Sequence, residues 1–133
     1  AEGDNTLYPS LGGHFFNADV SYGSTGDSSM LVSPVVDVSA LTNPELQYHI
    51  HRYGSIMADF YVDIYDGSQW HNGVHAYTDQ SGIQNSETDP YTDTAISLVP
   101  YLGSSNIVRA RFRTVTHGCC AGDNSLDDIS FDP

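Results

Sequence analysis

The sequence predicts an all-β protein, a jelly-roll β-sandwich of two antiparallel sheets. No segment of useful length has helical periodicity, and turn residues recur about every eight to twelve positions. Between the turns, short stretches alternate apolar and polar residues. Eight or nine short strands in 133 residues favour a jelly roll over an immunoglobulin domain, whose spaced Cys…Trp…Cys set is missing here.

The strands follow from this alternation and from the turns that bound it. We expect them over His14–Val20, Met30–Ser33, Leu46–Tyr53, Asp59–Tyr65, Trp70–Tyr77, Asp93–Leu98, Asn106–Val115 and Leu126–Phe131. Val35–Val38 would extend the second strand past Pro34. Two long polar loops, Ser21–Ser29 and Asp79–Asp93, complete the chain, and the second is expected to be a mobile edge because Ser-Gly, Asn-Ser and Asp-Pro pairs interrupt it.

Three strands have clearly different faces, because successive side chains of a strand point to opposite sides of its sheet. Their inward sets are Leu46, Tyr48 and Ile50, then Phe60, Val62 and Ile64, then Val108, Ala110 and Phe112. Their outward sets are Gln47, His49 and His51, then Asp59, Tyr61, Asp63 and Tyr65, then Arg109, Arg111 and Arg113.

The charge balance excludes several kinds of partner. The chain has 17 acidic residues, four arginines and no lysine, which gives a formal charge of −13. Such a surface repels nucleic acid and anionic membranes. No apolar run reaches the roughly 20 residues of a membrane span, so no membrane insertion is expected. The polar start Ala1–Asn5 is not a signal peptide, and 133 residues are enough for one domain, so we interpret the chain as a single domain excised from a larger secreted protein.

The only cysteines, Cys119 and Cys120, are adjacent and cannot link distant strands. A strained vicinal disulfide, two buried thiols and pairing with another chain all stay open. A zinc site would need more ligands than these two and the nearby His117.

The last strand carries two neighbouring carboxylates, Asp127 and Asp128, directly after the turn Gly122–Ser125. By alternation, one of the two should face away from solvent, which is costly unless it is protonated, paired or bound to a cation. Oxygen ligands beside a loop are typical of a calcium site. The alternative is that both are solvated carboxylates and turn caps.

Five segments, in order, resemble the motifs of the MAM domain, the jelly-roll adhesion module of receptor ectodomains and of many secreted bacterial proteins. They are Asp4–Thr6, Gly13–Asp19, Met30–Pro34, Leu46–Gly54 and Gly122–Phe131. The spaced cysteines of animal members are absent, which points to the bacterial branch, and the opening Phe-Glu strand of the family is also missing. Carbohydrate-binding modules of glycan-degrading enzymes share the architecture and a similar closing strand, so the motifs do not separate these two relatives.

The resemblance places Asp4 at the family's Asp-x-Thr, and a jelly roll brings this segment beside the last strand. Asp4, Asp127 and Asp128 are therefore the predicted ligands of a structural Ca²⁺ that joins the two chain ends.

Arg109, Arg111 and Arg113 form the second candidate site, with Tyr61, Tyr65 and Trp70. They could bind the anionic groups of uronic or sulfated sugars. Alternatively they form a structural ladder, in which the arginines pair with Asp59 and Asp63 and stack on Tyr61 and Tyr65. Trp70 would either cover the edge of the core or stack on a sugar. His49 and His51 are expected to be surface histidines without a third metal ligand.

Catalysis has no support in the sequence, because no nucleophile elbow, zinc-binding His-Glu-x-x-His or phosphate loop is present. We therefore expect a non-catalytic, extracellular binding module for a glycan or another cell-surface ligand. Carbohydrate binding and protein–protein adhesion, including self-association, are the two functions in competition.

Overall fold

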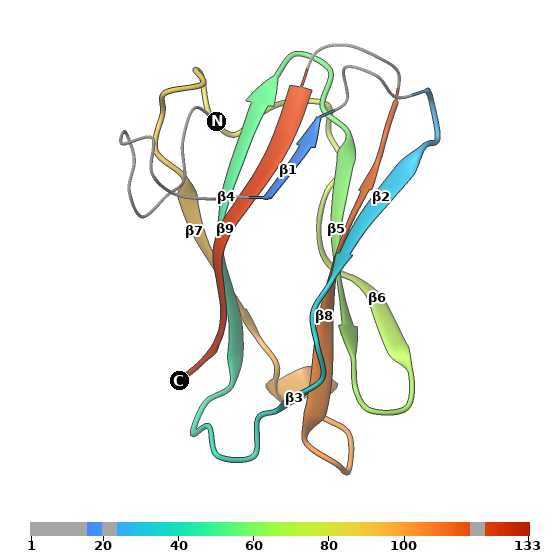
Figure 1. The fold of residues 1–133 in the computed structure, drawn as a ribbon, viewed down its shortest axis with the longest axis vertical. Coiled ribbons are helices and arrows are strands. Elements are labelled where there is room, and N and C mark those ends of the chain that lie inside the picture. Colours follow the sequence, from blue (N-terminus) through green and yellow to red (C-terminus); the bar gives the residue numbers. More distant parts are fainter. Residues whose placement is uncertain (1–15, 20–23, 118–121) are drawn as a thin grey trace.

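The structure, a computed structural model, describes residues 16–19, 24–117 and 122–133. These form a β-sandwich whose two sheets face each other (Figure 1). Its strands are β1 (Phe16–Asp19), β2 (Ser28–Val32), β3 (Val36–Asp37), β4 (Glu45–Gly54), β5 (Asp59–Tyr65), β6 (Trp70–Tyr77), β7 (Thr92–Ser97), β8 (Ile107–Val115) and β9 (Gly122–Asp132). A single 3₁₀ turn, Val99–Tyr101, is the one helical element of the described residues, and none of their helices could span a membrane.

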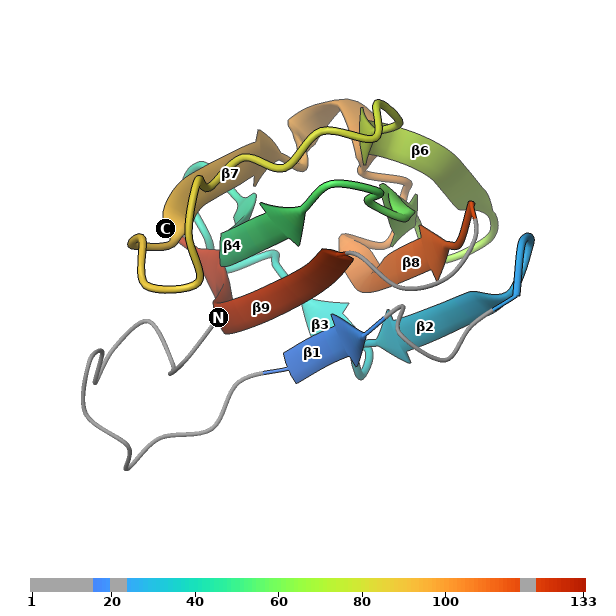
Figure 2. The same cartoon turned by 90° about the horizontal axis from the view of Figure 1, so that it is seen from above.

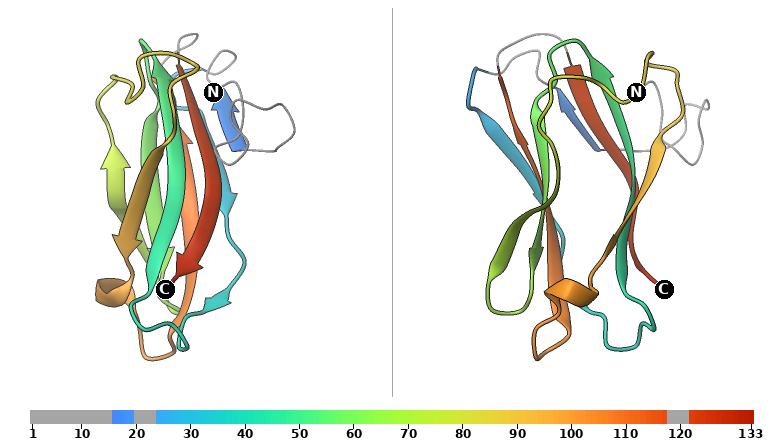
Figure 3. Two further views of the ribbon diagram at one scale, coloured as in Figure 1. Left: turned by 90° about the vertical axis from the view of Figure 1, so that its left-hand side faces the viewer. Right: turned by 180° about the vertical axis from the view of Figure 1, so that it is seen from behind.

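The strand order confirms the predicted jelly roll. The first sheet has the order β1-β9-β4-β7 and the second sheet the order β2-β8-β5-β6, with β3 also paired to β8. All pairs are antiparallel, and the chain crosses repeatedly from one sheet to the other, as seen from above in Figure 2 and from the side in Figure 3. β1 and β2 are edge strands, one in each sheet.

The predicted extension of the second strand past Pro34 is confirmed, because β2 and β3 both pair with β8. Ser33 stands at the interruption and bonds Ala110 twice: its backbone N–H donates to the Ala110 carbonyl at 2.8 Å, and its Oγ accepts from the Ala110 N–H at 2.8 Å. The side chain thus supplies an acceptor to the ladder just before a proline, which has no N–H to donate. Of the predicted strand His14–Val20, Phe16–Asp19 is observed and the rest lies outside the described residues.

The core lies between the sheets and uses the predicted inward sets. Tyr48, Phe60 and Phe112 meet at its centre, with ring centroids 5.2 Å apart for Tyr48–Phe112 and 6.1 Å for Phe60–Phe112. All three are at most 4 % exposed. Full burial of such a side chain stabilises the fold by about 1.5–3 kcal/mol. Further buried residues are Val38, Leu46, Ile50, Val62, Ile64, Leu98, Val108, Ala110 and Leu126.

Arg52 lies among these core residues, because it follows Leu46, Tyr48 and Ile50 in the inward alternation of β4. It is fully buried. Its Nε donates to Asn124 Oδ1 at 2.8 Å, its Nη2 donates to the Ala58 carbonyl at 3.0 Å, and its guanidinium lies 4.8 Å from the centre of the Tyr77 ring. The side chain therefore connects strands of both sheets at one end of the sandwich. Burial lowers the pKa of Arg52, although nearby acidic groups offset part of that effect.

The loop between β6 and β7, which the sequence predicted to be a mobile edge, is packed against β4 of the first sheet. Gln84 of this loop is buried, and its side chain bonds the backbone of β4 beyond the point where pairing with β7 stops. Its Oε1 accepts from the Arg52 N–H at 2.7 Å, and its Nε2 lies 3.2, 3.1 and 3.1 Å from the Ile50 carbonyl, the Pro90 carbonyl and Thr92 Oγ1. One side-chain amide thus satisfies backbone groups where β7 begins.

The same loop corrects the prediction for His51. This residue is on the outer side of β4, as predicted, but it is fully buried and not a surface histidine. Its ring lies 5.4 Å from that of Tyr91, and neither ring nitrogen has a hydrogen-bond partner in the described residues. Burial lowers the pKa of His51, and the nearby Ser86 and Asp89 offset part of the effect. Burial also lowers the pKa of His75.

We predict that the free energy of unfolding falls as the pH drops below about 6.5, the pKa of an unfolded histidine. Burial lowers the pKa of His51 and of His75 in the folded protein, so both stay neutral there just below pH 6.5. The unfolded chain binds more protons in this pH range, and this proton binding stabilises the unfolded chain relative to the folded protein. Urea unfolding between pH 7.5 and 5 measures the slope. His51→Phe and His75→Phe should each make it shallower and the double variant most of all; an unchanged slope in the double variant would contradict the prediction.

Candidate functional site

The strongest candidate site is on the outer face of the second sheet, where β5, β6 and β8 lie side by side. The three outward arginines of β8 are opposite outward residues of β5: Arg113 pairs with Tyr61, Arg111 with Asp63 and Arg109 with Tyr65. On the other side of β5, Tyr65 pairs with Trp70 of β6. The antiparallel register thus brings together residues that are up to 52 positions apart in the chain.

Asp63 is the centre of this face, and its side chain is completely buried. Its Oδ2 accepts from Arg111 Nε at 2.6 Å and from Arg113 Nε at 2.7 Å, and its Oδ1 accepts from Arg113 Nη2 at 3.1 Å. The Gly73 N–H also donates to Oδ1, at 2.8 Å. Gly73 has a φ of +64°, so glycine suits this irregular part of β6.

These bonds keep Asp63 ionised. Burial acts to raise the pKa of Asp63, but the hydrogen bonds from Arg113, the Gly73 amide and Arg111 outweigh it, and the pKa lies below its ordinary value. The same contact raises the pKa of Arg113. A buried carboxylate without these donors would be strongly destabilising, so the two arginines are necessary partners of Asp63.

Both arginines are also stacked on aromatic rings. The Arg111 guanidinium lies 4.1 Å from the centre of the Trp70 ring, and its Nη2 donates to Asn72 Oδ1 at 2.8 Å. The Arg113 guanidinium lies 4.5 Å from the centre of the Tyr61 ring. Stacking and the shared carboxylate together fix each planar cation in one orientation. We call Tyr61, Asp63, Tyr65, Trp70, Arg111 and Arg113 the arginine–aromatic platform.

The predicted ladder is confirmed for Asp63 and for the stacking on Tyr61. Its other parts are wrong. Asp59 holds the Tyr61 hydroxyl at 3.1 Å and His117 Nε2 at 2.7 Å, and binds no arginine. Trp70 takes the stacking place expected of Tyr65, whose ring lies 5.4 Å from it.

Arg109, the third predicted member of the comb, is oriented differently. Its Nε donates to the Ser33 carbonyl at 3.1 Å, at the break between β2 and β3. The arginines therefore do not form one uniform row. The Ser33 carbonyl is available to Arg109 because the Ala110 N–H donates to Ser33 Oγ instead. The sequence signal for this break in the strand is Pro34, and the signal for the stacking of Arg111 is the aromatic Trp70 at the start of β6.

The platform has a local charge opposite to that of the whole chain. Two guanidiniums and one carboxylate give it a net charge of +1, in a chain of −13. The side chains of Arg111 and Arg113 are 19 % and 22 % exposed, so parts of both cations reach solvent. Met30 of β2, which is opposite Arg113, is 54 % exposed and continues the face with apolar surface. A ligand with an anionic group and a flat apolar face fits this combination.

The predicted calcium site stays a prediction, because Asp4 lies outside the described residues. The expectation that Asp127 or Asp128 faces away from solvent is wrong. A bulge places two β9 residues opposite Tyr48, Asp128 has a φ of +49°, and Asp127 pairs with the outward His49. Asp127 is half-buried and Asp128 exposed, so neither lies in the core.

No group of three His, Cys, Asp or Glu residues in the described ranges is arranged to hold a metal ion. His49, one of the two histidines considered for a metal, has Nε2 at 2.5 Å from Asp93 and Nδ1 at 3.6 Å from Asp128. Cys119 and Cys120 lie outside the described residues, so the vicinal disulfide is also untested.

Comparison with known proteins adds no family. No model of a known protein family matches the chain. No curated protein matches it either. The structure therefore establishes the sandwich architecture, and the functional assignment depends on the chemistry of the sites.

We predict that Asp63→Asn lowers the free energy of unfolding by about 3 kcal/mol, because it removes the charge that neutralises two stacked guanidiniums. Urea denaturation at pH 7 measures the loss. The matched control is Asp93→Asn, whose carboxylate side chain is 87 % exposed beside His49 and should change stability by less than about 0.5 kcal/mol. Equal stabilities of the two variants would show that the buried carboxylate does not organise the platform.

Proposed function

We propose that this chain is a non-catalytic module that attaches a larger secreted bacterial protein to an anionic polysaccharide. The observation that carries the proposal is the pair of stacked arginines, Arg111 on Trp70 and Arg113 on Tyr61, fixed by one buried carboxylate. The proposed ligand carries uronate or sulfate groups on a sugar backbone.

Preorganisation supports the proposal. Arg111 and Arg113 are already held by Asp63 and by the rings, so ligand binding would cost little additional side-chain entropy. Guanidinium N–H groups that do not bind Asp63 or Asn72 suit carboxylate and sulfate oxygens. The rings of Tyr61 and Trp70 offer apolar area beside them, which a sugar ring can cover.

Charge gives the platform selectivity. The acidic remainder of the surface repels a polyanion, so binding at other places on the described surface is disfavoured and the platform supplies the attraction. Because the arginines are partly exposed, salt will screen this attraction.

The prediction for the platform is saturable binding of a polyuronate or a sulfated polysaccharide, which quenches the fluorescence of Trp70, the one tryptophan of the chain. Trp70→Ala and Arg111→Lys should each weaken binding about 10-fold or more, measured by calorimetry, because lysine cannot reproduce a stacked planar fork. Affinity should fall as salt rises. Tyr53→Ala, on the other sheet, is the control and should bind as wild type does.

Failure of every anionic glycan to bind more tightly than millimolar would overturn this proposal. A second function has its own observation: Met30 and Val35 are 54 % and 60 % exposed beside the edge of the second sheet. Absence of glycan binding together with a sedimentation coefficient that rises with protein concentration would favour adhesion through protein contacts.

The MAM assignment and the calcium ion belong to the same proposal. They are supported by the ordered motifs from Asp4–Thr6 to Gly122–Phe131 and by the jelly-roll strand order. In this fold β1 pairs with β9, and Phe16, the first described residue, is opposite Leu126, next to Asp127 and Asp128 in the sequence. An ion held by Asp4 and these carboxylates would link the two ends of the chain.

We predict that Ca²⁺ at about 100 times its Kd stabilises the fold by about 3 kcal/mol and that a chelator reverses the effect. Thermal unfolding with calcium and with EDTA measures it. Asp4→Asn should abolish the calcium-dependent rise in Tm, whereas Asp79→Asn, on the β6–β7 loop, should keep it. An unchanged Tm with EDTA would contradict the calcium site.

A further inference from the structure

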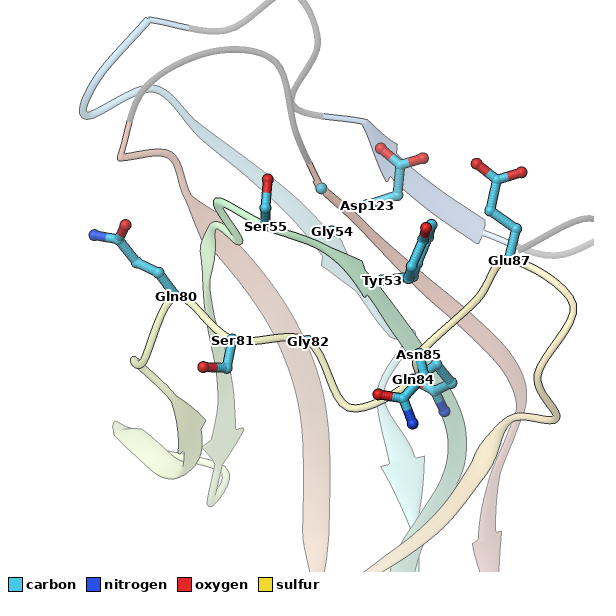
Figure 4. Close-up of a pocket in the computed structure, with 11 residues that line it drawn as sticks. Tyr53, Gly54, Ser55, Gln80, Ser81, Gly82, Gln84, Asn85, Glu87 and Asp123 are labelled. Atoms are coloured by element: carbon cyan, nitrogen blue, oxygen red, sulfur yellow. The ribbon is translucent and has the colours of Figure 1, made fainter.

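A concave surface lies at one end of the sandwich, and its lining shares no residue with the arginine–aromatic platform (Figure 4). It is a pocket of about 720 Å³ between the β6–β7 loop and the ends of β4 and β9, within the usual size range of small-molecule sites. We call it the rim pocket; it is lined by Tyr53, Gly54, Ser55, Gln80, Ser81, Gly82, Gln84, Asn85, Glu87, Gly122 and Asp123.

The floor of the rim pocket is built from closely packed backbone. The loop lies against β4 because the N–H groups of Ile83 and Gln84 donate to the Arg52 carbonyl at 2.8 and 3.1 Å. A Cβ on Gly82 would be 2.7 Å from that carbonyl oxygen, so a larger residue would push the loop away. A Cβ on Gly122 would be 2.5 Å from Met57 Sδ and 3.2 Å from the Ile56 carbonyl. Two glycines therefore set how closely these walls approach.

The loop is also fixed at its far end. The Asp89 carboxylate accepts from the N–H groups of Asn85 and Ser86 at 2.8 and 3.2 Å and from Ser86 Oγ at 2.9 Å. These bonds lower the pKa of Asp89, with the Asn85 amide as the largest cause. They enclose the turn that carries Glu87, so the residues of this wall are held in place before any ligand arrives.

The lining has the chemistry of a site for a polyol. It contains two carboxylates, Glu87 and Asp123, together with the amides and hydroxyls of Gln80, Asn85, Ser55 and Ser81. Tyr53 adds an aromatic ring that is 36 % exposed, and Figure 4 shows Tyr53, Glu87 and Asp123 directed to the same side. None of the lining residues is basic, and the neighbouring Arg52 is fully buried and bound to Asn124 and Ala58.

We infer that the rim pocket binds an uncharged saccharide, with the Tyr53 ring against one sugar face and the Glu87 and Asp123 carboxylates accepting hydrogen bonds from its hydroxyls. Carboxylates accept hydrogen bonds and side-chain amides both accept and donate them, so together they suit the neighbouring hydroxyl groups of a sugar. The same carboxylates repel the charged groups of uronate and sulfated sugars. The rim pocket thus selects the opposite ligand charge from the platform. It does not depend on the proposed function, because the two surfaces share no residue.

The test follows backbone amide NMR signals while maltose, cellobiose, laminaribiose and mannobiose are added separately to the whole chain. The amides of Gly54, Gly82 and Gly122 report the rim pocket, and the indole N–H of Trp70 reports the platform. At least one of these disaccharides should shift the glycine signals saturably in the millimolar range and leave the indole signal unchanged. Tyr53→Ala should weaken that binding about 10-fold or more, and Glu87→Gln should weaken it to a lesser extent. Trp70→Ala, which should weaken platform binding, should leave sugar binding in the rim pocket intact.

Three results would overturn the inference. The first is that none of the four disaccharides shifts the glycine signals. The second is that galacturonate shifts these signals more than the neutral sugars do. The third is that calcium chloride alone shifts them and no sugar reproduces the effect. Thermal melts of each variant verify that it is folded; if Tyr53→Ala is not, Glu87→Gln and Asp123→Asn carry the test. A failure here leaves the platform proposal standing, because that proposal is measured with anionic glycans and Trp70.

Discussion

The buried carboxylate of Asp63 is the constraint on which the order of the outer face of the second sheet depends. An ionised carboxylate that has lost all contact with water must be neutralised and fully hydrogen-bonded, and four donor contacts from Arg111, Arg113 and Gly73 do this. Once both Nε groups are fixed, each guanidinium plane lies over its ring, Trp70 or Tyr61. A requirement of stability thereby creates an ordered pair of cations, and it is this order that makes them suitable for ligand binding.

Arg52 has the corresponding role at the rim end of the sandwich. Its side chain connects β4 to Asn124 of β9 and to the Ala58 carbonyl, while its backbone receives the β6–β7 loop through Gln84. Three of the four arginines of the chain thus combine structural bonds with a position beside a candidate site, and Arg109 bonds the carbonyl of Ser33. In a chain without lysine, a few cations organise a surface that is otherwise acidic.

The two surfaces have complementary chemistry. The platform is net positive and aromatic; the rim pocket is concave, acidic and rich in amides. If both bind sugars, the module distinguishes glycans by charge at two places, one on a sheet face and one at a loop end. The rim pocket was not foreseen because its lining comes from three separate chain segments, none of which has a recognisable motif.

Strand alternation was sufficient to predict much of the fold. The inward sets of β4, β5 and β8 are buried as expected, because a period of two fixes the face of every residue in a regular strand. The prediction failed where that regularity ends. At Asp127 and Asp128 a bulge in β9 shifts the register, and Asp128 adopts a positive φ. At His51 the face was right but the exposure was wrong, because Tyr91, 40 positions later in the chain, packs against its ring.

By itself, then, the sequence determined the all-β class, the strands with their inward faces, the outward arginines of β8, and the acidic charge of the chain. These properties depend on local periodicity and on composition. Only the tertiary structure decided that Asp63 and not Asp59 binds the arginines, that Trp70 and not Tyr65 stacks on Arg111, and that Arg52 and His51 are buried. Those outcomes depend on the register between strands and on which loop covers which face, and such long-range contacts are not encoded in the spacing of residues along the chain.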